Sequence, residues 1–388
     1  MPPIVVEDPT PELTALREIA RAFCDREVRP GARDRDRDES FPTELVASMA
    51  DIGFLGAAIP EQYGGMGLDA FGYQVVVEEI GAADSSMRSM VSVNLGLFSM
   101  SVLKWGTEDQ KERWLPGCAA GKLGAFGLTE PDAGSNPSQM TSKAVRIDGG
   151  WVINGAKVYI TNGSMGAVTM IFARAIVDGE DQGITCFLVP QDSEGYAGTQ
   201  IHGKLGLRSG DTAEIALIDV HVGDDAVLGQ IGGGMKVALS ALDNGRFSLS
   251  AGCVGTAREA LEVGLDYALQ REQFGRKIAG FQLVQELLAA IHVDYSAARA
   301  LVDKVAIKKA AGVRFSQEVS TAKLFTTEAA VRCADRAVQI HGGHGYIDEY
   351  PVQRMLRDAR VTTLYEGTSQ IQHLILGRML TGISAFNG

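Results

Sequence analysis

Tyr365-Glu366-Gly367-Thr368-Ser369-Gln370-Ile371-Gln372 is the stretch around which this chain is organised. Its Ser-x-x-Gln spacing, from Ser369 to Gln372, predicts a capping box at the start of a helix. Glu366 therefore stands just outside a helix N-terminus, beside a glycine that leaves the loop flexible. We interpret Glu366 as a candidate catalytic base, held at one end and free to reach into a cleft. The alternative is an exposed acid that favours the helix dipole.

Composition is that of an ordinary soluble globular protein, with 45% apolar and 22% charged residues. A chain of 388 residues exceeds one compact core, so we expect two or three domains or lobes. The net charge of −12 argues against a nucleic-acid surface. No apolar run reaches ~18 residues, so we expect no membrane span. Residues 1–12 lack a signal or transit pattern, and we expect a cytoplasmic protein.

Cysteines are few and scattered, and none forms a C-x-x-C pair. Their number is odd, which argues against a disulfide framework, and their spacing argues against a zinc site. His341 and His344 are spaced i, i+3, but no acidic or cysteine ligand accompanies them. We therefore expect free thiols and no metal.

The hydrophobic period divides the chain into three domains. Residues 1–124 have helical periodicity, residues 125–232 alternate as strands do, and residues 233–388 return to the helical period. We expect an α+β multidomain fold with an N-terminal α-helical domain, a middle β-barrel or sandwich, and a C-terminal four-helix bundle. The strands expected are 143–147, 151–154, 168–175, 183–189 and 213–222. The C-terminal helices expected are 235–270, 282–311, 317–340, 352–360 and 369–380.

Local patterns add further expectations. The charged run 33–38 is interpreted as a solvated connector. The mostly apolar segment 85–105 predicts one helix, and Thr107 with Gln110 predicts a capping box at the start of the next. Asp148-Gly149-Gly150 and Asn154-Gly155 both predict hairpin turns.

Several motifs occur together in this order of blocks. They are Leu128-Thr129-Glu130-Pro131-Asp132-Ala133-Gly134-Ser135, Tyr159-Ile160-Thr161-Asn162-Gly163, Arg271-Glu272-Gln273-Phe274-Gly275, Gln339-Ile340-His341-Gly342-Gly343-His344-Gly345 and Tyr365-Glu366-Gly367-Thr368-Ser369. With them the chain resembles the acyl-CoA dehydrogenase family of flavoproteins over nearly its whole length. The resemblance implies FAD as cofactor, Glu366 as base, and a homotetramer or dimer in which FAD is shared between subunits.

The resemblance also implies which residues hold FAD. The flavin loop has Tyr159 where the family more often has Trp, and either flat ring can cover the flavin face. Arg271 is expected to hold the pyrophosphate of a neighbouring subunit's FAD, because an Arg fork matches that geometry. The full set of cofactor residues implied is Phe126, Leu128, Thr129, Gly134, Ser135, Tyr159, Ile160, Thr161, Arg271, Phe274, Gln282, Gln339, Gly342, Gly343, Thr368 and Gln370.

Substrate residues follow from the same resemblance. Those implied are Arg88, Ser92, Ser135, Asp243, Arg246, Tyr365 and Gly367. Arg88 and Ser92 match the glutaryl-CoA dehydrogenase branch, in which they hold a distal carboxylate, and they lie one helical turn apart. That branch also has a Glu where this chain has Gly81. A minority of the family has its base at the position of Gly245, so Glu366 has no rival here.

The chemistry follows from the thioester. Removing its weakly acidic α-proton needs a carboxylate whose pKa a dry site raises. The β-hydrogen leaves as hydride, and a flavin rather than a side chain accepts it. We therefore expect α,β-dehydrogenation of an acyl-CoA or acyl-carrier-protein thioester, with electron-transfer flavoprotein or another acceptor as redox partner. The acyl chain can end in a carboxylate or another polar group, or it can be a plain short chain. An acyl-CoA oxidase or a flavin monooxygenase on the same fold is the alternative activity. A non-enzymatic helical scaffold would not need these motifs.

Overall fold

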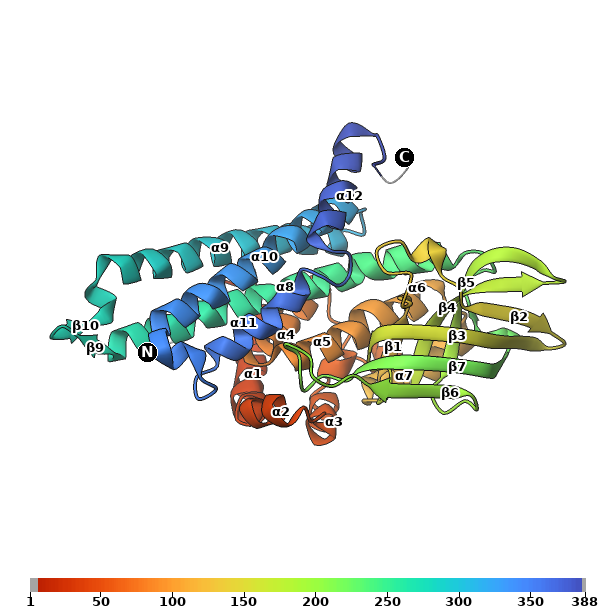
Figure 1. Ribbon diagram of the computed structural model, residues 1–388, viewed down its shortest axis with the longest axis horizontal. Coiled ribbons are helices and arrows are strands. Elements are labelled where there is room, and N and C mark those ends of the chain that lie inside the picture. The colour runs from red at the N-terminus through yellow and green to blue at the C-terminus, as the bar shows by residue number, and fades with distance from the viewer. Residues whose placement is uncertain (1–5, 386–388) are drawn as a thin grey trace.

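The computed structural model describes residues 6–385. Its N-terminal part consists of helices packed on one another and on the long helices that follow the sheet (Figure 1). These are α1 (Pro11–Phe23), α2 (Ala32–Asp38), α3 (Thr43–Asp51), α4 (Ala70–Ala83), α5 (Ser85–Ser92), α6 (Met100–Trp105) and α7 (Glu108–Ala119). The capping box predicted for α7 is confirmed, since Thr107 and Gln110 cap one another. The helix expected over 85–105 is interrupted by a π-helical stretch, η4 (Val93–Ser99).

The charged run 33–38 is largely solvated, with four of its six residues exposed, but it forms most of the helix α2 and is not the connector that the sequence predicts. Asp36 is buried, and its Oδ2 lies 2.6 Å from Nη2 of Arg357. Arg35 Nη2 lies 3.0 Å from Oδ2 of Asp84. The run is helical because its charges have partners in elements that are distant in sequence.

The middle part is a single twisted sheet whose strands run in the order β6-β7-β3-β2-β4-β5-β8, with β1 beside β4. The strands are β1 (Gly124–Gly127), β2 (Lys143–Ile147), β3 (Gly150–Thr161), β4 (Val168–Val177), β5 (Glu180–Pro190), β6 (Tyr196–Gln200), β7 (Thr212–Gly223) and β8 (Val227–Leu228). Within the described residues β6 does not pair with β8, so the sheet is open rather than the closed barrel that we expected.

Of the two predicted hairpin turns, one is present. Asp148 and Gly149 connect β2 to β3, whereas Asn154-Gly155 lies inside β3. There the register with β7 shifts between Ile153 and Gly155, and the φ of Gly155 is 156°. Asn154 faces two residues of β7, Ile218 and Asp219, so the extra residue of this bulge belongs to β7, and Asn154-Gly155 continues the strand instead of turning.

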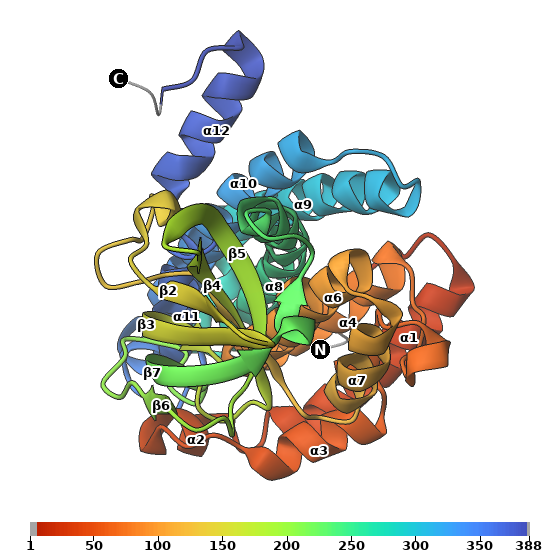
Figure 2. The ribbon, with the colours of Figure 1, turned by 90° about the vertical axis from the view of Figure 1, so that its right-hand side faces the viewer.

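The C-terminal part is helical, as predicted. It contains α8 (Gly234–Gln270), α9 (Gln282–Ala310), α10 (Ser316–His341), α11 (Val352–Thr362) and α12 (Ser369–Thr381), with a small hairpin of β9 (Glu272–Gln273) and β10 (Arg276–Lys277). The unbroken α8 contacts β5 near one end and α4, α9 and α10 along its length. In Figures 1 and 2, α12 projects away from the body.

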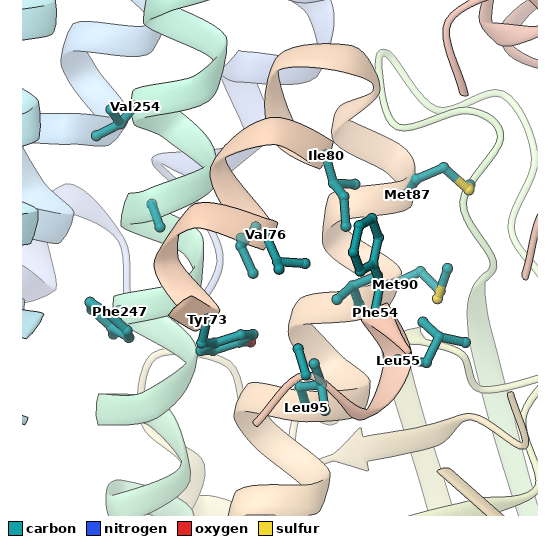
Figure 3. Close-up of a cluster of buried hydrophobic side chains, with 14 of the residues drawn as sticks. Phe54, Leu55, Tyr73, Val76, Ile80, Met87, Met90, Leu95, Phe247 and Val254 are labelled. Atoms are coloured by element: carbon teal, nitrogen blue, oxygen red, sulfur yellow. The ribbon is translucent and has the colours of Figure 1, made fainter. Parts of the chain in front are cut away.

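The largest apolar core joins all three parts. It contains Phe54 from the N-terminal helices, Phe172 from β4 and Phe247 from α8. Figure 3 shows the α4 side of this core, where Tyr73 and Val76 lie between α8 and the chain around Leu55. All five cysteines are free and buried. Among residues 6–385, no helix combines the length and apolar character that crossing a membrane requires.

Candidate active site

Glu366 lies in the short loop between α11 and α12, at a left-handed backbone position with φ 54°. Gly367 follows with φ 88°. The predicted capping box is wrong in its register: Thr368, not Ser369, caps α12, and its Oγ1 accepts from Ile371 N at 3.2 Å. The side chain of Gln372 turns back to the base instead.

The backbone carbonyls of the loop accept hydrogen bonds from three side chains on three helices. Arg246 Nε and Gln372 Nε2 each lie 3.1 Å from the carbonyl oxygen of Glu366. The buried Lys323 donates from Nζ to the carbonyl oxygen of Gly367 at 2.7 Å. These bonds fix the main chain and leave the Glu366 side chain free. Its Oε2 is buried and has no hydrogen-bond partner in the described chain.

Gly245 on α8 makes room for this carboxylate. A Cβ at that position would lie 2.6 Å from Glu366 Oε2 and 2.5 Å from Leu97 Cδ2. Any other residue there would therefore displace the carboxylate or the helix.

Burial raises the pKa of Glu366 to about 7, against the opposing effect of the Arg246, Lys323 and Arg88 charges. A carboxyl with a pKa near neutrality is matched to proton abstraction at physiological pH. The geometry and the electrostatics therefore both fit a general base.

Arg88 is buried on α5 and has a neutral partner. Its Nη2 donates to the Tyr365 hydroxyl at 2.8 Å, and it makes no ion pair in the described chain. Its stem crosses α8 at Gly252, where a Cβ would lie 2.4 Å from Arg88 Cδ. A Cβ at Gly81 would lie 2.7 Å from the Cα of Gly252, so no Glu fits there. A buried guanidinium without a counter-ion is expensive and suits an anionic or polar ligand.

Ser92 is buried one turn after Arg88 and bonds to Ser248, with an Oγ–Oγ distance of 2.7 Å. Asp243 and Arg246, the other predicted pair, are joined by an Oδ1–Nη1 contact of 3.2 Å. Ser316 Oγ donates to the second Asp243 oxygen at 2.6 Å. Arg246 thus links Asp243 to the backbone of the base.

The predicted flavin loops meet where β1 and β3 end. Val158 N donates to the Thr129 carbonyl at 3.0 Å, which places Thr129 beside Tyr159. Tyr159 has φ 60° and is 70% exposed, so its ring offers a free flat face. The hydroxyls of Thr129, Thr161 and Ser135 make no hydrogen bond in the described chain. Free hydroxyls beside an exposed ring fit the edge and face of a flavin.

The other residues of these loops contribute in different ways. Phe126 packs against Phe172 with 5.1 Å between ring centroids, and Leu128 is buried. The side chain of Ile160 lies in the sheet core, so only its backbone can face a cofactor. Gly134 and Ser135 are exposed on the loop after β1, and Gln370 is exposed at the start of α12.

The second predicted FAD group lies elsewhere. Arg271 and Phe274 are exposed beyond the far end of α8, and Figure 1 shows this hairpin at the end of the molecule opposite the sheet. Gln282 starts α9 beside it, and Gln339, Gly342 and Gly343 end α10 there. Arg271 follows Arg246 by about 25 residues, or ~37 Å of helix. The two groups therefore lie far apart in one copy of the chain (Figure 1).

His341 and His344 are not a metal pair. Together with Tyr267 and Tyr350 they form an aromatic cluster, in which the rings of Tyr267 and His341 stack at 4.2 Å. No group of metal-binding residues occurs in the described part of the chain.

The sequence analysis did not identify three residues that contact the predicted site residues. Lys323 bonds to Gly367, Ser248 bonds to Ser92, and Tyr73 bonds to Ser248. Lys323 falls on the buried stripe of α10 with Val319, Ala322 and Thr326. A lysine at such a position indicates a functional contact, and this periodicity could have identified it. Ser248 lies among other small residues of α8, and nothing in its neighbours distinguishes it.

Three family models match the chain: the acyl-CoA dehydrogenase N-terminal domain over 10–122, the middle domain over 125–220 and the C-terminal domain over 232–381. An acyl-CoA dehydrogenase of Bacillus subtilis (strain 168) is 38% identical over 96% of this chain and 99% of its own.

Solved structures agree. Butyryl-CoA dehydrogenase from Megasphaera elsdenii has TM-score 0.92 and 35% identity, covering 97% of this chain and 100% of its own. Glutaryl-CoA dehydrogenase from Mycobacterium smegmatis has TM-score 0.93 and 36% identity, covering 97% and 96%. Fold and site define a FAD-dependent oxidoreductase that dehydrogenates the CH–CH bond of an acyl thioester. The chain belongs to the acyl-CoA dehydrogenase family.

Proposed function

We propose that Glu366 is the base that removes the α-proton of the acyl thioester. The observation that carries this is its buried Oε2, which has no hydrogen-bond partner in the described chain and belongs to a carboxyl whose pKa burial raises to about 7. When bound, FAD supplies the hydride acceptor for the β-hydrogen. Gly245 leaves space for the carboxylate, and Arg246, Lys323 and Gln372 hold its backbone.

The backbone N–H of Glu366 makes no hydrogen bond in the described chain. We assign it to the thioester carbonyl, because a fixed donor at that oxygen stabilises the charge that develops when the α-proton leaves. The same residue thus supplies the base through its side chain and a donor through its main chain.

Replacing Glu366 with Gln tests the base. The amide keeps the shape of the side chain and removes the basic oxygen, so FAD content and thioester affinity should persist while flavin reduction stops. The measurement is stopped-flow absorbance of the flavin band after mixing with thioester. Bleaching at a near wild-type rate would place the base elsewhere.

For the acyl chain, we propose a carboxylate or other polar group at its far end, held by Arg88 and Ser92. The support is the buried, unpaired charge of Arg88. The other candidate is a plain short chain. Screening CoA and carrier-protein thioesters by mass spectrometry separates the acyl groups and the two carriers. Oxygen consumption without an added acceptor separates an oxidase from a dehydrogenase that passes electrons to electron-transfer flavoprotein or another acceptor.

We further propose that a second copy of the chain completes the FAD site through Arg271, Phe274, Gln282 and the 339–343 segment. The length of α8 between Arg246, beside the base, and Arg271 supports this shared site. Thr368 and Gln370 lie next to the base and are assigned to the same cofactor. Analytical ultracentrifugation of the purified yellow protein is expected to show a dimer or tetramer. A monomer that retains FAD would contradict the shared site.

A further inference from the structure

Three hydroxyl groups from three helices form a continuous row beside Arg88. Tyr73 of α4 donates from its hydroxyl to Ser248 Oγ of α8 at 2.8 Å. Ser248 Oγ lies 2.7 Å from Ser92 Oγ of α5. All three side chains are at most 2% exposed, so water does not satisfy them.

A count of hydrogens shows that one donor in this row is left over. Each hydroxyl has one hydrogen, and the hydrogens of three hydroxyls serve only two hydrogen bonds. Tyr73 uses its own, and Ser92 and Ser248 share one bond between them. Whichever serine donates in that bond, the other retains an unused hydrogen.

The unused hydrogen is not taken by the helices. Ser250, two residues after Ser248 on α8, donates from its hydroxyl to the carbonyl oxygen of Arg246 at 2.6 Å, as buried helical serines commonly do. Neither Ser248 nor Ser92 makes such a bond to the carbonyl one turn earlier within the described chain. A buried donor left without an acceptor is costly, which indicates that a ligand supplies the acceptor.

The row lies on the side of the site where the substrate chain would end. Ser92 follows Arg88 by one turn of α5, and a Cβ at Gly96 would lie 3.4 Å from both Ser248 Cβ and Gly245 Cα. Gly245 in turn contacts the Glu366 carboxylate. The charges of Glu366 and Arg88 both act on the pKa of Tyr73, which burial raises above its usual range. The row therefore lies close to both the base and Arg88.

We propose that Tyr73 and Ser248 are positioning residues that direct the free hydrogen of Ser92 into this end of the acyl pocket, and so select a chain ending in an oxygen acceptor. The Tyr73 hydroxyl occupies one acceptor position of Ser248, which biases the shared bond so that Ser248 donates to Ser92. Ser92 then points its free hydrogen at the ligand beside the Arg88 guanidinium. A carboxylate accepts from both, and an amide accepts through its carbonyl. A terminal ammonium is rejected, because the Arg88 guanidinium carries the same charge and no carboxylate of the described chain pairs with Arg88. This inference rests on the proposed dehydrogenation of acyl thioesters.

The test compares Tyr73→Phe and Ser248→Ala with Ser250→Ala as a matched control. Ser250 is equally buried on the same helix, but its hydroxyl bonds only to the helix backbone. Dissociation constants for glutaryl-, glutaramyl- and butyryl-pantetheine thioesters are measured by calorimetry in the Glu366→Gln background, so that binding is measured without turnover. Flavin reduction by the same thioesters is measured in the wild-type background.

We expect Tyr73→Phe and Ser248→Ala to weaken glutaryl and glutaramyl binding by about three- to tenfold, the value of one hydrogen bond. Butyryl binding should stay within twofold, and Ser250→Ala should change none of the three. A parallel loss for butyryl would show that the hydroxyls serve packing and would overturn the inference. No change for any thioester would also overturn it.

Failure of the proposed function gives a different result. If none of the three thioesters reduces the flavin of the wild-type protein, the assignment as a thioester dehydrogenase is wrong. If it reduces flavin with butyryl thioester but neither binds nor uses the oxygen-terminated chains, dehydrogenation stands and the role proposed for Tyr73 and Ser248 is overturned.

Discussion

Gly245 and Glu366 are in such close contact that the hydrogen on the Gly245 Cα is the largest substituent the base tolerates. A Cβ there would lie 2.6 Å from Glu366 Oε2. The helix that lines the site thus determines where the carboxylate rests, although it contributes no side chain at that point.

Gly245→Ala should therefore slow flavin reduction by about 100-fold, because a shift of the base by about 1 Å is that costly. Stopped-flow reduction with the best thioester measures it. Gly264→Ala is the control, since its Cβ would meet only the ends of flexible side chains, Ile340 Cδ1 at 3.3 Å and Leu288 Cδ2 at 3.8 Å. Equal losses in both variants would indicate general damage to α8.

The rate of flavin reduction should rise with pH through about 7 and then level off, because only the ionised form of Glu366 accepts a proton. A pH profile between 5 and 9, measured with saturating thioester, checks this. A profile that is flat across this range would contradict the raised pKa.

The same raised pKa makes Glu366 a cost to stability above neutral pH. The folded protein binds this proton more tightly than the unfolded chain, so the stability present below pH 4.5 is lost as pH rises toward about 7. Glu366→Gln should thus raise the free energy of unfolding by about 1–3 kcal/mol at pH 8. At pH 4.5 the gain should be small. Urea unfolding of the FAD-free protein at the two pH values measures the difference, and an equal effect at both would contradict it.

Lys323→Met removes both a hydrogen bond to Gly367 and a positive charge that lowers the pKa of Glu366. The pH profile of flavin reduction should move upward by about one unit. Lys308→Met, which breaks only the partly exposed pair with Glu318, should leave the profile in place. A shift to lower pH would contradict the role assigned to Lys323.

Arg88→Met should reduce kcat/KM for a glutaryl thioester by roughly 30- to 1000-fold, since a charged contact in a dry pocket contributes ~2–4 kcal/mol. Butyryl thioester should be hardly affected, because its chain ends in a methyl group. If both substrates change in parallel, Arg88 is structural, and a plain short-chain substrate replaces the polar one.

The sequence predicts the helices of this fold well, because their apolar periodicity reflects burial that the structure reproduces. It predicts less well wherever a distant residue decides the local conformation. The charged run 33–38 is helical because Arg357 and Asp84 neutralise parts of it. Asn154-Gly155 continues β3 and does not turn, because β7 pairs on both sides of it.

The active site shows the same division. The motif around Glu366 singles out the residue that we propose as the base, and the spacing of Arg88 and Ser92 places them on one helix face. The partners that complete the site, Lys323, Tyr73 and Ser248, come from segments that carry no motif. Their roles depend on how α4, α8 and α10 pack, and helix packing is not readable from local spacing.

The continuity of α8 has a consequence for how this protein opens. The helix carries Gly245 and Arg246 at the site and Arg258 in a buried ion cluster with Glu78 and Glu79. At 1.5 Å per residue it is ~55 Å long and has no proline at which to yield. Fraying that starts at Gln270 cannot reach Gly245, beside the base, without first breaking the ion cluster at Arg258. We therefore expect the backbone amides from 245 to 258 to exchange with solvent together, as one cooperative unit.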